Sequence, residues 1–266
     1  IVSPNPNTIA VTEAFQLDLT AVMLKNLIPA ICALIATIVL ASLLAKQTGD
    51  GISQNDLEAA PAEKLPNALQ AFAGPLTVIV LLALRPLAKI SVDPLIALPL
   101  GGLVCILVTG NIRNLIPYTD FGLSKVIGVA ILLIGTGTIA GIIKASALQK
   151  DMTTLLSAMN MPAFILAPLS GILMAAATAS TTAGSTVASQ TFSGTLLAAG
   201  VPALSAAAMI HAGATVLDSL PHGSFFHATG GSVYMDIKNR MKLIPFEALI
   251  GLTSTIVAVI LYLVTA

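Results

Sequence analysis

From Met152 to Leu217 the chain contains no aspartate, glutamate, lysine or arginine. So long a stretch without a full charge cannot include a long solvent-exposed loop. The composition agrees: of 266 residues, 56% are hydrophobic and 9% are charged, whereas soluble domains carry about 25% charged residues. The sequence therefore predicts an integral membrane protein. Its formal net charge of zero, without a basic run, indicates no nucleic-acid partner.

Apolar segments recur along the chain and predict an all-α, polytopic membrane protein. They lie at about 21–44, 68–84, 93–109, 122–143, 163–177, 203–220 and 244–265. A helix needs roughly 20 residues to cross the hydrocarbon. The first, fourth and last segments meet this length, the second, third and sixth are marginal, and the fifth is too short unless the polar stretch after it continues the span. Two charged segments, 45–67 and 221–243, predict solvated loops. The segment 144–160 has apolar residues at helical spacing and predicts an amphipathic helix.

Hydroxyl side chains crowd residues 178–190, directly after the short apolar segment. Hydroxyls offer donors and acceptors without the roughly 2.5–3.5 kcal/mol that insertion scales assign to a charge at the bilayer centre. A broken helix beside them exposes backbone N–H groups at the positive end of the helix dipole. Transporters with inverted repeats place their substrate at such breaks. We therefore predict a broken or re-entrant helix here, with substrate-binding residues Thr178, Ser180, Thr181, Thr182, Gly184, Ser185 and Thr186.

A second stretch, residues 134–146, has the same character. Its glycines loosen an otherwise spanning helix and its threonines add hydroxyls. We therefore predict a facing break at Gly135–Thr138 and add Gly135, Thr136, Gly137 and Thr138 to the predicted binding residues. For both stretches, helix packing is the alternative to a binding site. Small residues in membrane helices let helices approach closely, and Ser or Thr can bond back to their own helix carbonyls.

Both stretches resemble a known transporter family. The strings GTGTIAGIIKAS at 135–146 and ATASTTAGSTVAS at 177–189 are similar to the second-half signatures of the gluconate permease family. These proteins are bacterial inner-membrane symporters for gluconate and related hydroxy-carboxylates. The opening Pro6-Asn7-Thr8, with Glu13-Ala14-Phe15 and Asp18-Leu19-Thr20, also resembles the family's middle region. The resemblance implies proton-coupled import of a small organic anion by a multi-pass protein of the bacterial inner membrane.

The resemblance also implies how the chain is organised. Residues 1–120 would hold membrane helices and the loop that links two halves, and residues 121–266 would hold the second of two inverted transport repeats. The family's first repeat would precede Ile1. The chain, which does not begin with Met, is therefore expected to be an N-terminally truncated fragment. The wider ion-transporter superfamily further implies a partner subunit, and so a homodimer.

One region points to a branch within the family. Residues 218–222, DSLPH, look closer to members that handle short hydroxy acids such as 3-hydroxybutyrate than to the gluconate carriers. Residues 223–231, GSFFHATGG, depart from the family's Asn-Gly-containing continuation. Gluconate and a short hydroxy acid therefore both stay open as substrates.

Proton coupling needs a group that changes its protonation state. His211 lies inside the segment 203–220 and, on a helix, would share a face with Thr215 and Asp218. Intramembrane ionisable groups are functional candidates, and histidine titrates nearest to physiological pH. We predict His211, Asp218 and His222 as proton-coupling residues. The alternative is a buried histidine that holds a carbonyl and an aspartate that anchors the segment at the interface.

Other functions remain as alternatives. Hydroxyls and unwound carbonyls also suit sodium as the coupling ion. A channel or a structural membrane component is the different class, although a channel would more naturally show a pore-lining ring of polar residues. The sequence predicts no enzyme, because no nucleophile elbow or metal spacing accompanies its serines and histidines. Cys32 and Cys105 lie apart in apolar segments, and no cofactor or metal is expected.

Overall fold

The computed structural model describes residues 1–265 apart from 3, 49–65, 89, 91 and 159–160. Within these residues all regular secondary structure is helical, which confirms the all-α prediction. The chain forms two compact units: unit 1 comprises Ile1–Leu44 and Val129–Ala266, and unit 2 comprises Ala45–Gly128. The predicted division at residue 120 concerns roles in transport and stays a prediction.

Unit 2 is built on a helical hairpin. It contains α4 (Ala68–Ala88), α5 (Pro94–Val108), the short 3₁₀ helix η2 (Ile112–Asn114) and the start of α6 (Leu115–Ala145). A reciprocal cap begins α4, because Asn67 Oδ1 accepts from Gln70 N at 2.9 Å and Gln70 Oε1 accepts from Asn67 N at 3.1 Å. The two long helices approach closely where Gly74 meets Gly101: a Cβ on Gly74 would lie 3.0 Å from Gly101 O.

Unit 1 holds the remaining helices. With most of α3 and the C-terminal part of α6, it contains α1 (Pro6–Ala14), α2 (Leu19–Lys25), α7 (Leu148–Ala158), η3 (Ala163–Ile165), α8 (Leu166–Thr178), α9 (Thr181–Ala198), α10 (Ala203–Gly213), α11 (Ser224–Ser232), α12 (Ile237–Met241) and α13 (Ile244–Thr265); α3 runs over Leu27–Thr48. The segment 144–160, predicted as an amphipathic helix, contains α7.

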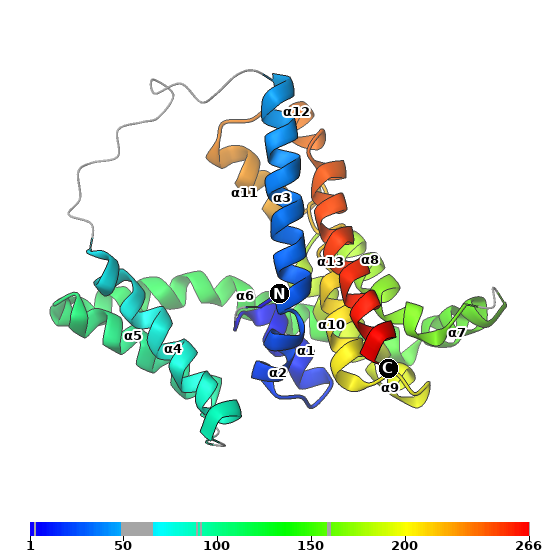
Figure 1. Ribbon diagram of the computed structural model, residues 1–266, viewed down its shortest axis with the longest axis horizontal. Helices are drawn as coiled ribbons and strands as arrows, with labels where there is room; N and C mark the ends of the chain where they lie inside the picture. Colours follow the sequence, from blue (N-terminus) through cyan, green and yellow to red (C-terminus); the bar gives the residue numbers. More distant parts are fainter. Residues whose placement is uncertain (3, 49–65, 89, 91, 159–160, 266) are drawn as a thin grey trace. The chain divides into compact units, whose positions relative to one another are not determined.

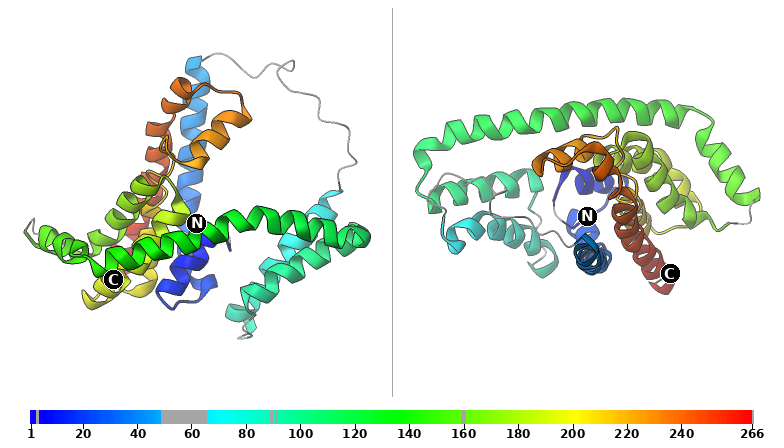
Figure 2. Two further views of the ribbon diagram at one scale, coloured as in Figure 1. Left: turned by 180° about the vertical axis from the view of Figure 1, so that it is seen from behind. Right: turned by 90° about the horizontal axis from the view of Figure 1, so that it is seen from above.

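Helix α10 forms the centre of unit 1. Its residues from Ser205 to Gly213 are all buried, and α1, α2, α8, α9 and α13 pack around it (Figures 1 and 2). Glycines bring the helix backbones into contact: a Cβ on Gly171 of α8 would lie 2.3 Å from Ile210 O, and one on Gly213 would lie 2.4 Å from Pro168 O. Close packing by small residues is therefore the organising feature of this unit.

The break predicted at Gly135–Thr138 is absent. Helix α6 runs without interruption through these residues, and Thr138 Oγ1 donates to Ile134 O at 3.1 Å, which is the back-bonding alternative. Glycine lowers helix propensity, but in an apolar segment each backbone group still needs a partner, and the helix supplies it. The side chain of Thr136 and the burial of Gly137 lie outside the described part. A role for this stretch in binding stays a prediction.

Two helices among the described residues are long and apolar enough to cross a membrane, Leu27–Lys46 and Ile237–Thr265. Shorter apolar helices, Ala68–Leu84, Pro94–Val108, Ala163–Thr178 and Ala203–Gly213, occupy the segments predicted to be marginal or too short. These helices support a membrane protein. A multi-pass topology in the inner membrane stays a prediction.

The segment 221–243, predicted as a solvated loop, contains α11 and α12. Phe226 and Gly230 of α11 and Arg240 of α12 are buried. The prediction was wrong in that short helices form here and Arg240 is buried, where Glu247 of α13 neutralises it. The other charged residues of the segment, Asp236, Lys238 and Lys242, are exposed as predicted. The other predicted loop, 45–67, lies largely outside the described residues.

Candidate functional site

The helix is interrupted between α8 and α9, inside the hydroxyl-rich stretch 178–190. Ala179 adopts a left-handed conformation with φ of 45°, and Ser180 caps α9, its Oγ accepting from Ala183 N at 3.3 Å. A left-handed backbone is strained for a residue with a Cβ. Residues 214–223, which we call the 218 loop, pack against this turn, since a Cβ on Gly223 would lie 2.3 Å from Ala179 O. The expected helix break is present; its re-entrant placement in a membrane stays a prediction.

The first turn of α9 reaches two other elements. Thr181 Oγ1 donates to Asp218 Oδ2 at 2.5 Å, and Thr182 Oγ1 donates to Asn7 Oδ1 on α1. Both threonines are half-buried. The start of α9 is therefore a junction of α9, α1 and the 218 loop.

The second turn of α9 is a packing surface. Ser185 and Thr186 are buried, and their hydroxyls donate to Thr182 O at 3.3 and 2.7 Å. A Cβ on Gly184 would lie 2.6 Å from Ala175 Cα of α8. These contacts fit the alternative in which small and hydroxyl residues serve close helix packing. The side chains of the predicted site that contact other polar groups, Thr181 and Thr182, therefore lie in the first turn of α9 and not in the second.

The Asp218 carboxylate lies at the N-terminus of α9. Its Oδ2 accepts from Thr181 Oγ1, and its Oδ1 accepts from Ser219 Oγ at 3.0 Å. The unpaired N–H groups of a first turn give a helix N-terminus positive potential. The helix end and the two hydroxyls together stabilise a carboxylate at this position.

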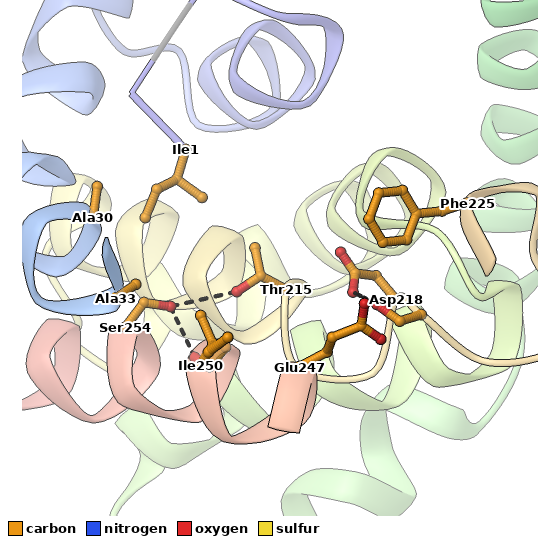
Figure 3. A pocket seen from close by; sticks show the side chains of 11 residues that line it. Ile1, Ala30, Ala33, Thr215, Asp218, Phe225, Glu247, Ile250 and Ser254 are labelled. Atoms are coloured by element: carbon orange, nitrogen blue, oxygen red, sulfur yellow. Dashed lines mark hydrogen bonds between the residues drawn. The ribbon is translucent and has the colours of Figure 1, made fainter. Parts of the chain in front are cut away.

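Asp218 also lines a pocket of about 350 Å³ in unit 1 (Figure 3). Helix α3 forms one wall and α13 forms another. The polar lining comes from the 218 loop and from Glu247 and Ser254 of α13, and α11 contributes Phe225. Thr215 Oγ1 of the loop lies 3.4 Å from Ser254 Oγ of α13. The lining residues are Ile1, Ala30, Ala33, Thr215, Asp218, Ser219, Phe225, Glu247, Ile250, Gly251 and Ser254.

A second carboxylate lies beside Asp218 in this pocket. The side chains of Asp218 and Glu247 point toward one another (Figure 3), and their carboxylates are close enough to interact electrostatically. Arg240 donates two hydrogen bonds to the Glu247 carboxylate, from Nη1 to Oε2 and from Nη2 to Oε1, each 2.8 Å long. The Arg240 guanidinium also lies 4.9 Å from the centre of the Phe226 ring, and its Nε donates to Thr229 Oγ1 at 3.1 Å.

His211 is placed differently from the prediction. Helix α10 ends at Gly213, so the helical stripe predicted to join His211, Thr215 and Asp218 does not form. The reason is local: Gly213 packs against α8, and Thr215 Oγ1 turns back to donate to Ala212 O at 2.7 Å. The His211 ring is fully buried, and neither of its nitrogens has a hydrogen-bond partner among the described residues.

The remaining predicted residues are distributed around this site. Thr178 Oγ1 donates to Met174 O at 2.8 Å in the last turn of α8. His222 is an exposed residue of the 218 loop. The structure thus brings together Ser180, Thr181, Thr182 and Asp218. The described residues that line the pocket include neither His211 nor His222.

Sequence reasoning missed two residues of this junction. Glu247, near the start of the apolar segment 244–265, was not among the predicted site residues, and Asn7 entered only through the family resemblance. An acidic residue at the start of an apolar helix, seven positions after an arginine, was the available signal for Glu247. Nothing local in the sequence connects Asn7 with Thr182, because their contact joins distant parts of the chain.

The chain is similar to one curated protein. It is 53% identical over 262 residues to a Haemophilus influenzae protein named "Uncharacterized transporter". The match covers 98% of this chain and 62% of the relative, so the chain spans less than two thirds of the relative's length. No protein-family model matches the chain. A comparison with solved structures finds no match.

Proposed function

We propose that this chain is part of a secondary transporter that imports a small hydroxy-carboxylate, gluconate or a related acid, together with a proton. Three observations support the proposal: the name of the Haemophilus influenzae relative, the resemblance to the gluconate permeases, and the site at the start of α9. The observation that carries it is the Asp218 carboxylate at this helix end, hydrogen-bonded to Thr181. A helix end that holds an internal carboxylate has the chemistry to hold a substrate carboxylate.

Proton coupling follows from competition for this position. While Asp218 is ionised, its carboxylate occupies the α9 terminus and accepts from Thr181 and Ser219. Once protonated, Asp218 is neutral and is a weaker acceptor. A substrate carboxylate can then take its place, so that one proton and one anion enter together. The protein would work by alternating access and would not be an enzyme.

The finer features of the proposal come from the resemblance. The transporter would be a multi-pass protein of the bacterial inner membrane, built from two inverted repeats and paired as a homodimer. This chain would supply the second repeat. Because it spans 62% of its relative, the transport assays described here use the full-length carrier.

The test is uptake by the full-length carrier in proteoliposomes with an imposed pH gradient and no sodium. Labelled gluconate is followed, with unlabelled 3-hydroxybutyrate as competitor. We expect gluconate to accumulate with the gradient and the competitor to have little effect. Asp218→Asn is expected to abolish gradient-driven accumulation but to keep substrate exchange across the membrane, because the neutral side chain leaves the α9 terminus open and carries no proton.

Other outcomes assign the alternatives. If labelled 3-hydroxybutyrate moves and gluconate does not, the substrate is a short hydroxy acid. If uptake needs a sodium gradient instead of a pH gradient, the coupling ion is sodium and not a proton. Conductive flux without accumulation would indicate a channel, and the symporter proposal would be wrong.

A further inference from the structure

Arg240 and Glu247 form an ion pair that is unusual in its burial. Arg240 is 2% exposed, whereas the Glu247 side chain is 28% exposed and reaches the pocket. The guanidinium is held on three sides: two hydrogen bonds to Glu247, one to Thr229, and the face of the Phe226 ring. An arginine fixed in this way positions its carboxylate partner rigidly.

The rigid carboxylate faces the group that the proposed function makes responsible for coupling. Glu247 and Asp218 approach from different elements, α13 and the 218 loop, and their side chains point toward one another (Figure 3). A like charge at short range disfavours ionisation of the second carboxyl group. Arg240 neutralises Glu247 directly, so Asp218 is the carboxyl group that gains a proton when the two compete for one.

The other ionisable groups near the 218 loop do not take this role. His211 on α10 is buried outside the pocket, and His227 on α11 is bonded to Pro221 O at 2.8 Å. His222 is exposed to solvent. Ile1 lines the pocket with an apolar side chain. On α9, the element that binds Asp218 directly, the contact is the neutral hydroxyl of Thr181.

We propose that Glu247, held in place by buried Arg240, is a positioning residue of the coupling site: its charge raises the pH at which Asp218 takes up the transported proton. The inference rests on the proposed proton symport. Glu247 acts through Asp218 and does not itself contact the substrate carboxylate.

The experiment measures the pH of half-maximal gradient-driven uptake by the full-length carrier and its Glu247→Gln variant. Removing the charge beside Asp218 stabilises the ionised form of Asp218, so proton uptake should need more acidic conditions. We expect the half-maximal pH to fall by about one unit. The matched control is Glu13→Gln, the same chemical change at an exposed residue of α1, which should leave the half-maximal pH unchanged.

Two further variants keep the test decisive. Glu247→Gln leaves Arg240 buried beside a neutral partner, so the double variant Arg240→Met with Glu247→Gln removes both charges; apolar replacement of a buried ion pair is often tolerated. It should shift the half-maximal pH in the same direction but by less, because the positive charge of Arg240 is removed together with the negative charge of Glu247. In an Asp218→Asn background, Glu247→Gln should have no effect on the pH dependence of substrate exchange, because the group through which Glu247 acts is gone.

The two proposals fail in different ways. If the unaltered carrier shows no proton-driven uptake, the proposed function is wrong. If it does, but both Glu247 variants reduce the rate without moving the half-maximal pH, Glu247 and Arg240 have a structural role and the inference is overturned. A shift that persists in the Asp218→Asn background would also overturn it.

Discussion

Thr181 links the start of α9 to Asp218, the proposed coupling residue. Its backbone belongs to the first turn of α9, while its hydroxyl donates at 2.5 Å to Asp218, a residue distant in the sequence. A hydrogen bond to a charged acceptor contributes about 1.5–3 kcal/mol. Thr181 therefore stabilises the ionised form of Asp218, opposite in sign to the effect proposed for Glu247.

Thr181→Val should raise the pH of half-maximal uptake by about one unit. Without the hydroxyl donor the ionised Asp218 is less stable, so it takes up its proton under less acidic conditions. The same loss should weaken substrate affinity. Proteoliposome uptake against pH measures both effects. Thr181→Ser, which keeps the hydroxyl, should behave like the unaltered carrier, and equal behaviour of the Val and Ser variants would remove Thr181 from the site.

His211 is another of the three residues predicted to couple transport to protons. Its buried ring nitrogens have no hydrogen-bond partner among the described residues, so an apolar side chain of similar size removes an unsatisfied polar group. We expect His211→Leu to keep or raise the melting temperature of the purified protein and to leave the half-maximal pH of uptake unchanged. A shifted pH profile would restore His211 to the coupling site that the sequence predicted.

At the scale of the elements, the sequence predicted what depends on local composition. Hydroxyl density beside a short apolar segment predicted the break between α8 and α9, and helical periodicity predicted α7. The break at Gly135–Thr138 was wrong because helix hydrogen bonding outweighs low propensity in α6. The Glu247–Arg240 pair and the Asn7–Thr182 contact could not be predicted, since they depend on how separate helices pack.

Two glycines of α9, Gly184 and Gly194, differ in how closely other atoms pack against them. A Cβ on Gly184 would lie 2.6 Å from Ala175 backbone atoms, whereas one on Gly194 would meet no described atom within 4 Å. Gly184→Ala should therefore push α8 and α9 apart and destabilise the protein by about 3 kcal/mol. Gly194→Ala should stabilise it by about 0.5–1 kcal/mol through helix propensity. Thermal unfolding in detergent compares them, and equal melting temperatures would contradict the close α8–α9 contact.

At the scale of the whole molecule, many apolar side chains of α3 are exposed, and about 6% of its most apolar stretch is buried within the chain. In a membrane protein such a face contacts lipid or further protein. The chain spans 62% of its relative, and the family resemblance implies a carrier with two transport repeats, of which this chain would hold one. Both considerations bear on whether this chain can transport by itself.

We expect the 266-residue chain, expressed alone, to insert into the membrane but to transport nothing. Helices α3 and α13 are long and apolar enough to anchor it, and its core around α10 is contained within unit 1. Alternating access, however, needs one repeat to move against another around the bound substrate. Membrane fractionation tests insertion, and proton-driven uptake of labelled gluconate tests transport, with the full-length carrier as positive control. Saturable uptake by the chain alone would show that its own helices complete the site, and the two-repeat mechanism would then be wrong for this protein.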